Sequence, residues 1–138
     1  LPNGLARGVR TASDFLMALQ LTGAARTDSI ANMQLRLPIV VVGGGLTAID
    51  TATESLAYYP LQVEKFLSRF ETLRSWRLQT ATERGVSSDV ILSTASLWAL
   101  AEHNPRTLEA MEGLEDLGPW RLRTYGPSIL RVLHPRDR

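Results

Sequence analysis

The chain contains no cysteine among its 138 residues. This absence excludes disulfide bonds, thiolate-bound zinc and thiol catalysis. Histidine is almost as scarce: the two in the chain, His103 and His134, lie far apart, so neither a zinc site nor a serine–histidine–aspartate triad is indicated. No set of spaced carboxylates resembles a nuclease metal site. We therefore expect no metal ion and no catalytic residues, and we favour a non-enzymatic role.

Long apolar runs are missing too. Apolar runs such as that from Ile39 to Val42 are far shorter than a membrane span requires. The first residues show no basic and apolar leader segment. We accordingly expect a cytoplasmic protein without a membrane partner. Because the sequence begins at Leu1 and not at methionine, we also expect a fragment or a processed chain.

Excess charge is absent as well, and lysine is rare. Lys65 is the single lysine among 15 basic residues, and the net charge is +1. Any contact with nucleic acid must therefore come from the local placement of arginines. A composition of 44% hydrophobic and 21% charged residues is ordinary for a folded chain, and the length allows one domain or two very small ones.

Apolar residues recur at helical spacing along most of the chain. Pro60 is expected to separate two of the helices, and Gly126-Pro127 another two. Residues 37–42 are predicted to form a buried strand instead, because their β-branched residues are nearly consecutive. The expected helices are 13–21, 47–58, 61–84, 89–92, 94–103, 108–111, 119–125 and 128–133. Ser13-Asp14, Ser93 and Thr107 are the candidate N-caps of three of them, and Gly23 can stop the first.

Residues 39–50, IVVVGGGLTAID, place three glycines between the expected strand and a helix. Gly43, Gly45 and Ala48 fit the G-x-G-x-x-G/A pattern, in which glycines let a pyrophosphate approach a helix N-terminus. GGGLTAID and the upstream GVRTASDFLMAL resemble the NADPH-binding region of glutamate synthase small-chain-like oxidoreductases, over roughly residues 4–70. The resemblance implies a Rossmann-type turn, with cofactor-binding residues at Gly43, Gly44, Gly45 and Thr47.

The rest of a dinucleotide-binding unit is missing from the sequence. Such a unit needs a second parallel strand and an acidic residue or arginine about 20 residues beyond the turn. Residues 63–76 occupy that window and have helical spacing, and a single parallel strand has no ladder partner. We therefore expect no cofactor, with NADPH or FAD considered only if other segments complete the sheet. A fragment of an NADPH-linked oxidoreductase is thus the alternative function.

A second set of features extends over residues 74–133. It consists of Trp76-Arg77, Gly85-Val86, Val90-Ile91, Leu97, Leu100-Ala101, Pro105, Thr107-Leu108, Gly118, Arg121, Tyr125 and Gly126. In this order they resemble the HRDC domain, the small helical module of RecQ-type helicases and ribonuclease D. The resemblance implies an auxiliary nucleic-acid-binding unit, in some members a protein-contact surface, with no catalytic residues of its own.

Arginines and aromatic residues are interleaved near the end of the chain. From Pro119 onward, five arginines accompany one acidic residue, Asp137. Guanidinium groups suit phosphate, and aromatic rings can stack on unpaired bases. Tyr125 could equally face the core together with Leu122. The expected partner is single-stranded or branched nucleic acid, and the candidate binding residues are Gly118, Trp120, Arg121, Arg123, Tyr125 and Arg131.

Acidic residues limit the expected affinity of this surface. Asp116 stands where HRDC hairpins usually carry a glycine, and its charge repels phosphate. From Arg74 onward the sequence has nine basic and eight acidic residues, so binding should be weak and salt-dependent. The acidic stretch from Glu109 to Asp116 could instead contact a protein partner, so a protein-contact module is the third candidate function.

We predict a mainly helical fold in two parts. Residues 1–72 would form an incomplete Rossmann-type strand–turn–helix fragment, and residues 73–138 an HRDC-like helical domain. Because apolar residues continue at helical spacing from Val63 through Trp76, one long helix is expected to cross the boundary between the two parts. The favoured function is that of an auxiliary nucleic-acid-binding module.

Overall fold

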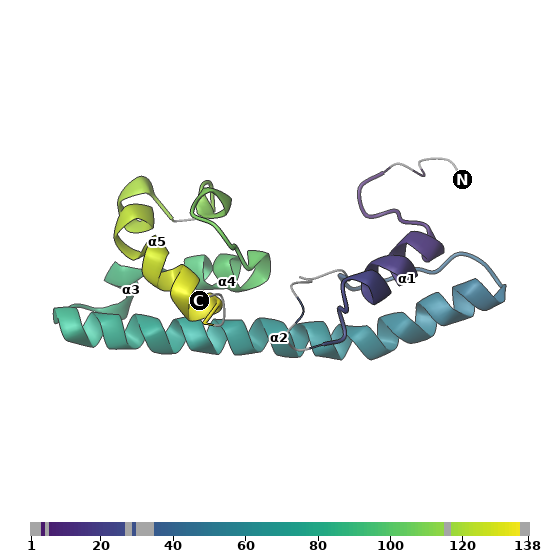
Figure 1. Ribbon diagram of the computed structural model, residues 1–138, viewed down its shortest axis with the longest axis horizontal. Helices are drawn as coiled ribbons and strands as arrows, with labels where there is room; N and C mark the ends of the chain where they lie inside the picture. Colours follow the sequence, from purple (N-terminus) through teal and green to yellow (C-terminus); the bar gives the residue numbers. More distant parts are fainter. Residues whose placement is uncertain (1–3, 5, 27–28, 30–34, 115–116, 136–138) are drawn as a thin grey trace. The chain divides into compact units, whose positions relative to one another are not determined.

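The computed structural model describes residues 4, 6–26, 29, 35–114 and 117–135, and over these residues the fold is helical without strands. Two units divide the chain, residues 1–64 and residues 65–138 (Figure 1). None of the described helices is long and apolar enough to cross a membrane. The elements are α1 (Ala12–Leu21), α2 (Leu46–Arg84), α3 (Ser88–Ile91), α4 (Thr94–His103), the 3-10 turn η1 (Glu109–Met111) and α5 (Pro119–Leu133). The predicted helical fold class is confirmed.

Helix α2 is longer than the sequence suggested. It continues through Pro60 for 39 residues, so the predicted break at this proline is wrong. Proline lacks the N–H that would bond to the carbonyl of Leu56, yet the ring is exposed and the helix on either side is held by buried residues. The long helix expected across Val63 to Trp76 is confirmed, and the division after Glu64 falls within it.

The predicted strand at residues 37–42 is absent. Val40 and Val42 are 82% and 73% exposed, and only Ile39 packs on the core of the first unit. A strand needs a hydrogen-bonded partner, and none is present in the part of the chain that the structure describes. The glycines after it lead directly into α2, where the carbonyl of Gly45 accepts hydrogen bonds from Ala48 and Ile49.

The first unit packs α1 on the N-terminal part of α2. Thr11, and not the predicted Ser13, caps α1: its Oγ1 accepts a hydrogen bond of 3.2 Å from the N–H of Asp14. Gly23, with a φ of +56°, follows the end of α1 as expected, because glycine adopts this left-handed conformation without strain. The core consists of Phe15, Leu19, Ala24, Leu35 and Tyr58.

One buried side chain takes the place of a strand partner in this unit. Gln62 of α2 is 2% exposed. Its Oε1 accepts a hydrogen bond of 3.1 Å from the N–H of Leu35, and its Nε2 donates one of 2.6 Å to the carbonyl of the same residue. The amide thereby satisfies both backbone groups of a buried residue that has no helix or sheet around it.

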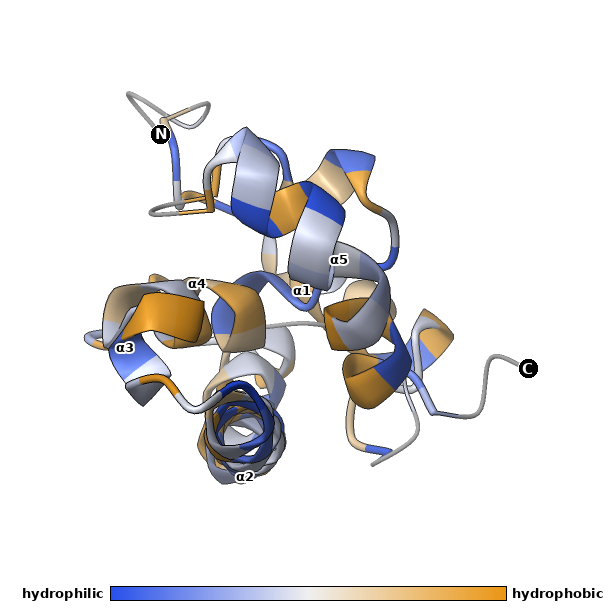
Figure 2. Cartoon of the chain, turned by 90° about the vertical axis from the view of Figure 1, so that its left-hand side faces the viewer, coloured by the Kyte–Doolittle hydropathy of each residue, from blue (hydrophilic) through white to orange (hydrophobic). Residues whose placement is uncertain are grey.

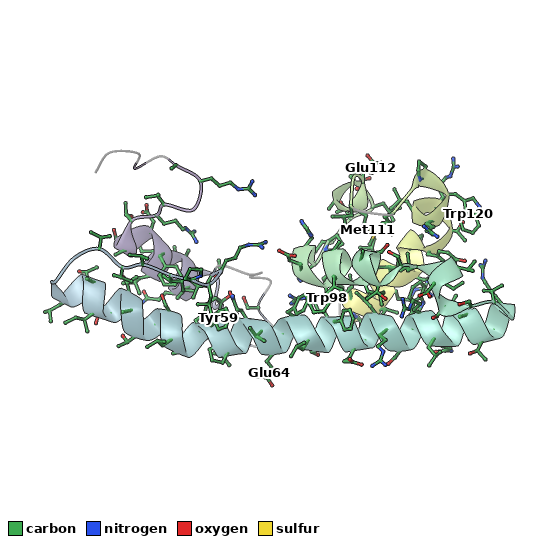
Figure 3. The ribbon with its side chains drawn as sticks, turned by 180° about the vertical axis from the view of Figure 1, so that it is seen from behind. Tyr59, Glu64, Trp98, Met111, Glu112 and Trp120 are labelled. Carbon is green, nitrogen blue, oxygen red and sulfur yellow. The ribbon has the colours of Figure 1, made fainter. Side chains whose placement is uncertain are left out.

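The second unit is a bundle built on the C-terminal part of α2. Figure 2 shows apolar stretches on α4 and α5, as expected for helices that bury one face. Trp98 of α4 packs on two rings of α2, with centroids 4.9 Å from those of both Phe66 and Phe70 (Figure 3). The fully buried side chains of this unit include Leu73, Ile91, Leu92, Leu97, Leu100, Met111 and Ile129.

Local capping signals position α4 and η1 as predicted. Ser93 Oγ accepts a hydrogen bond of 3.1 Å from the N–H of Ser96 at the start of α4. Thr107 Oγ1 accepts one of 3.2 Å from the N–H of Ala110, although the turn that it caps is 3-10 and not α. Both hydroxyls satisfy donors that a helix cannot pair internally.

Helix α5 is a single element, so the predicted division at Gly126-Pro127 is wrong. Tyr125 and Ile129 lie one turn apart and are both buried, which keeps this face of the helix on the core across the proline. Gly126 lies close to the segment before η1: a Cβ there would lie 2.6 Å from Cδ2 of Leu108, so the end of that side chain would have to move. The segment before η1 can therefore pack directly against the α5 backbone.

Candidate nucleic-acid interface

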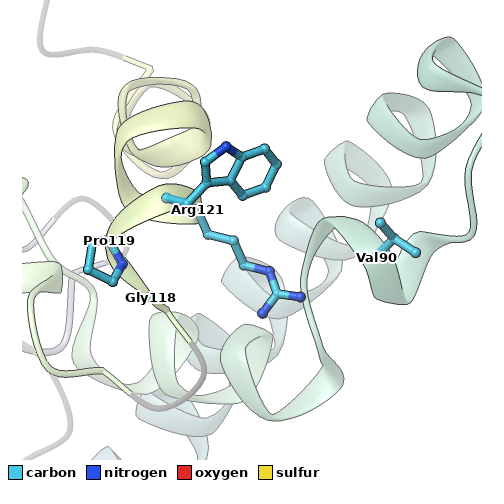
Figure 4. A pocket seen from close by; sticks show the side chains of 5 residues that line it. Val90, Gly118, Pro119 and Arg121 are labelled. Carbon is cyan, nitrogen blue, oxygen red and sulfur yellow. The ribbon is translucent and has the colours of Figure 1, made fainter.

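An open hollow of about 400 Å³ lies between α3 and the start of α5 (Figure 4). Val90 forms one side, and residues Gly118 to Arg121 form the other. Val90 and Trp120 are 55% and 58% exposed. Two large apolar side chains are thus presented to solvent at one place, where the core does not use them.

The N-terminus of α5 places partial positive charge at this hollow. Gly118 is the N-cap residue and has no side chain with which to cap, and Pro119 occupies the first helical turn. The first intrahelical bond runs from the N–H of Leu122 to the carbonyl of Gly118, at 3.0 Å. The N-terminus of a helix of 15 residues favours an anion through its dipole and its backbone N–H groups.

Tyr125 is the buried ring on which Trp120 of the hollow packs. Its ring is 3% exposed and meets Trp120 edge-on, with centroids 5.7 Å apart, and Trp76 in the same manner at 6.0 Å. The guanidinium carbon of Arg84 lies 5.0 Å from the centroid of the same ring. Tyr125 therefore belongs to the core and holds Trp120 in place, because a ring this deeply buried has no face available for a base.

The arginines of α5 are distributed on its accessible sides. Arg123 and Arg131 are exposed and follow Trp120 by three and eleven residues, which places all three on one face of the helix. Arg121 is half-buried and extends from the start of α5 along the hollow (Figure 4). Basic groups therefore border the exposed indole on two sides.

Acidic residues lie on η1 and directly after it. The pKa of the Glu109 carboxyl is lowered, first by the hydrogen bond from its own backbone N–H and then by the Thr107 side chain. Glu109 is therefore ionised at neutral pH, and Glu112 projects from the same segment in Figure 3. The acidic Glu115 and Asp116, the latter predicted to repel phosphate, lie outside the described residues, as do Arg136, Asp137 and Arg138.

The glycine turn of the first unit lies at the N-terminus of α2. Gly43 has a φ of +141°, and Gly43, Gly44, Gly45 and Thr47 are all exposed. The Rossmann-type strand expected before it does not form within the described residues, and cofactor binding at this turn stays a prediction. No group of histidine, aspartate or glutamate residues that could hold a metal ion occurs in the part of the chain that the structure describes.

The sequence did not single out Val90, which lines the hollow, or Arg84, which lies over Tyr125, as binding residues. Val90 belongs to a helix of four residues, and Arg84 is the last residue of α2. In the sequence, Arg84 follows Trp76 by eight residues, about two helical turns, and this spacing indicates that the two residues lie near the same side of the helix. For Val90 no local signal exists, because its exposure depends on where α5 begins.

Comparisons with known proteins agree with this architecture. Residues 66–133 match the family model of the HRDC domain. The chain is 57% identical over 70 residues to the uncharacterized protein RP006 of Rickettsia prowazekii, an alignment that covers 51% of this chain and 10% of that protein. It is 34% identical over 64 residues to the ATP-dependent DNA helicase UvrD2 of Mycobacterium tuberculosis, covering 46% and 9%.

A third relative is the ribonuclease D of Psychromonas ingrahamii, 33% identical over 67 residues that cover 49% of this chain and 18% of the enzyme. The chain thus spans less than a fifth of the length of each of these three relatives. No solved structure matches it. HRDC domains of the helicase and ribonuclease D type are generally auxiliary nucleic-acid-binding modules. The second half of this chain, residues 66–133, is such an HRDC domain.

Proposed function

We propose that this HRDC domain binds single-stranded or branched nucleic acid, weakly and without catalysis, through one side of α5. This surface, the α5 face, is defined by Gly118, Trp120, Arg121, Arg123 and Arg131. The observation that carries the proposal is an indole 58% exposed at the start of an arginine-bearing helix. A tryptophan that the core does not need, held edge-on by a buried tyrosine, is a preformed stacking platform.

The arginines supply the charge that such a platform needs. Each guanidinium can form two parallel hydrogen bonds with a phosphate, and neutralising phosphates releases counterions. Arg123 and Arg131 are exposed, so they reach a backbone without rearrangement of the helix. Few arginines contribute, and Glu109 on η1 adds a negative charge to the same unit, so the affinity should be low and should fall steeply with salt.

Fluorescence anisotropy with the full chain tests this proposal. Labelled single-stranded, forked and duplex oligonucleotides would be titrated at several salt concentrations. Arg121→Ala combined with Arg123→Ala should weaken binding and lower the salt slope by roughly 1.4, since each phosphate contact to a single strand contributes about 0.7. Arg74→Ala is the matched control, because Arg74 is an exposed arginine of α2 paired with Glu71 at 3.3 Å.

Absence of binding even at low salt would contradict the proposal for this protein. The acidic segment that begins at Glu109 would then be the first surface to test as a protein-contact site, by charge reversal at Glu112 and Glu115. Nothing in the described fold supports nucleotide binding at Gly43 to Thr47 beyond the position of these residues at a helix start.

A further inference from the structure

The hollow between α3 and α5 has the chemistry of a site for a flat apolar group. Its volume of about 400 Å³ is within the range of small-molecule sites, roughly 300–1,000 Å³. Val90, Pro119 and Trp120 present carbon surface to it, and Gly118 adds no side chain. Because the hollow is open to solvent, a group that remains attached to a long polymer can enter it without being enclosed.

The charges around the hollow indicate what that polymer carries. Arg121 lines the hollow itself. Arg84 of α2 does not line the hollow, but the carbon of its guanidinium lies 5.0 Å from the centroid of the Tyr125 ring, and that ring meets Trp120 edge-on with centroids 5.7 Å apart. An apolar recess lined by one guanidinium group, with a second one on the tyrosine that packs against its indole, is complementary to a planar base flanked by phosphates.

We propose that this hollow receives one unstacked base of a single strand and that Arg84 binds a phosphate next to it. The inference rests on the proposed nucleic-acid function and deepens it by naming an unpaired base as the ligand. A base within a duplex is stacked and paired, so its face cannot reach Trp120. Single strands, loops and the arms of forks expose such bases.

Arg84 is suited to this role by its place in the fold. It is the last residue of α2, where the helix dipole favours a cation, and Gly85 with a φ of +65° ends the helix directly after it. Its side chain is exposed while its guanidinium lies over Tyr125. Stacking on an aromatic ring limits the orientations of the guanidinium and leaves its N–H groups available along its edge.

The test compares two probes with the full chain. One is a labelled oligothymidylate, and the other is an abasic oligonucleotide of the same length, which keeps the phosphates and lacks the bases. The wild-type protein should bind the first about 5- to 150-fold more tightly, the range expected for stacking one base. Trp120→Leu should remove most of this difference and leave the affinity for the abasic strand nearly unchanged.

Two further variants make the result specific to the hollow. Val90→Met, which fills the hollow from the opposite side, should also reduce the preference for bases. Trp98→Leu is the matched control, because Trp98 is 48% exposed but packs on α2 outside the hollow. Circular dichroism of each variant confirms that the helices are retained.

The role of Arg84 has its own readout. Arg84→Ala should weaken the binding of both probes to a similar extent and lower the salt slope by about 0.7. Arg74→Ala should change neither quantity. An unchanged salt slope in Arg84→Ala would overturn the assignment of Arg84 as a phosphate contact.

The outcomes separate the two proposals. Equal affinity of the wild-type protein for both probes overturns the base site, while salt-dependent binding of both would leave the proposed function intact. A base preference that persists in both Trp120→Leu and Val90→Met also overturns it. If neither probe binds at low salt, the proposed function fails and this inference fails with it.

Discussion

Arg77 Nη1 donates a hydrogen bond of 3.0 Å to the carbonyl oxygen of Leu92, the C-cap residue that follows α3. Eight residues earlier on α2, Arg69 Nε donates one of 2.8 Å to the carbonyl of Ala101 in the last turn of α4. Both carbonyls belong to helix C-termini, where internal donors run out. Two arginines of α2 thus hold the ends of two helices, and their charge serves the fold and not the nucleic-acid surface.

Replacement of Arg77 by alanine should destabilise the second unit. The side chain is 12% exposed, so its loss leaves the carbonyl of Leu92 without this donor, and the free energy of unfolding should fall by about 1–3 kcal/mol. The contact of Arg77 with Asp89, whose side chain is 77% exposed, should contribute little. Urea unfolding measures the difference. A loss no greater than that of the exposed control Arg74→Ala would contradict this role.

Gln62 should be equally important in the first unit. Gln62→Leu keeps the size of the side chain but removes both hydrogen bonds to Leu35, leaving a buried N–H and carbonyl without these partners. We expect a loss of about 2–5 kcal/mol in the free energy of unfolding. Gln62→Glu retains an acceptor for the N–H of Leu35 but loses the donor to its carbonyl, so this variant separates the effects of the two hydrogen bonds. Hydrogen exchange at Leu35 provides the local readout, and an unchanged exchange rate in Gln62→Leu would refute the assignment.

Pro60→Ala should stabilise α2. Alanine supplies the missing N–H to the carbonyl of Leu56 and removes the clash of the proline ring, a gain of about 3 kcal/mol in a helix interior. The greater freedom of the unfolded chain offsets up to about 1 kcal/mol of this, so a net gain near 2 kcal/mol is expected. Far-UV circular dichroism during urea unfolding measures it. The exposed Glu64→Ala is a control in the same helix, and a loss of stability in Pro60→Ala would show that the proline is required.

Acidification should weaken the contribution of Glu109. Its pKa is lower in the folded chain than in the unfolded one, so the unfolded state binds the proton more readily. The stabilisation is therefore present at neutral pH and is lost as the pH falls through the folded pKa. The urea midpoints of wild type and Glu109→Gln should differ at pH near 7 and converge as the pH falls through the folded pKa of Glu109. Glu112→Gln controls for loss of charge alone.

Much of the second unit could be predicted from local signals. Ser93 and Thr107 were expected to be capping residues, and their hydroxyls accept hydrogen bonds from the N–H groups of Ser96 and Ala110. The spacing of apolar residues from Val63 through Trp76 correctly predicted that a helix crosses the boundary between the two parts. Such signals are reliable because a cap and the residues it serves lie within one turn of each other.

The errors arose where packing overrides local preference. Residues 37–42 favour a strand, but no second strand is present in the described fold, and Val40 and Val42 remain exposed. Proline was expected to end a helix at Pro60 and again at Pro127, yet in both places the buried residues on either side keep one continuous helix. Propensity differences are small compared with the burial of several side chains.

The sequence by itself determined the helical character of the chain, its HRDC half and the presence of arginines and aromatic residues near the start of α5. Only the tertiary structure decided which of these residues are exposed to solvent. It buries Tyr125 at 3% exposure and leaves Trp120 at 58%. It also brings Val90 of α3 to the hollow beside Trp120 and Arg84 of α2 over the ring of Tyr125. The physical reason is that periodicity fixes which side of a helix a residue occupies, whereas exposure depends on the partners that cover that side.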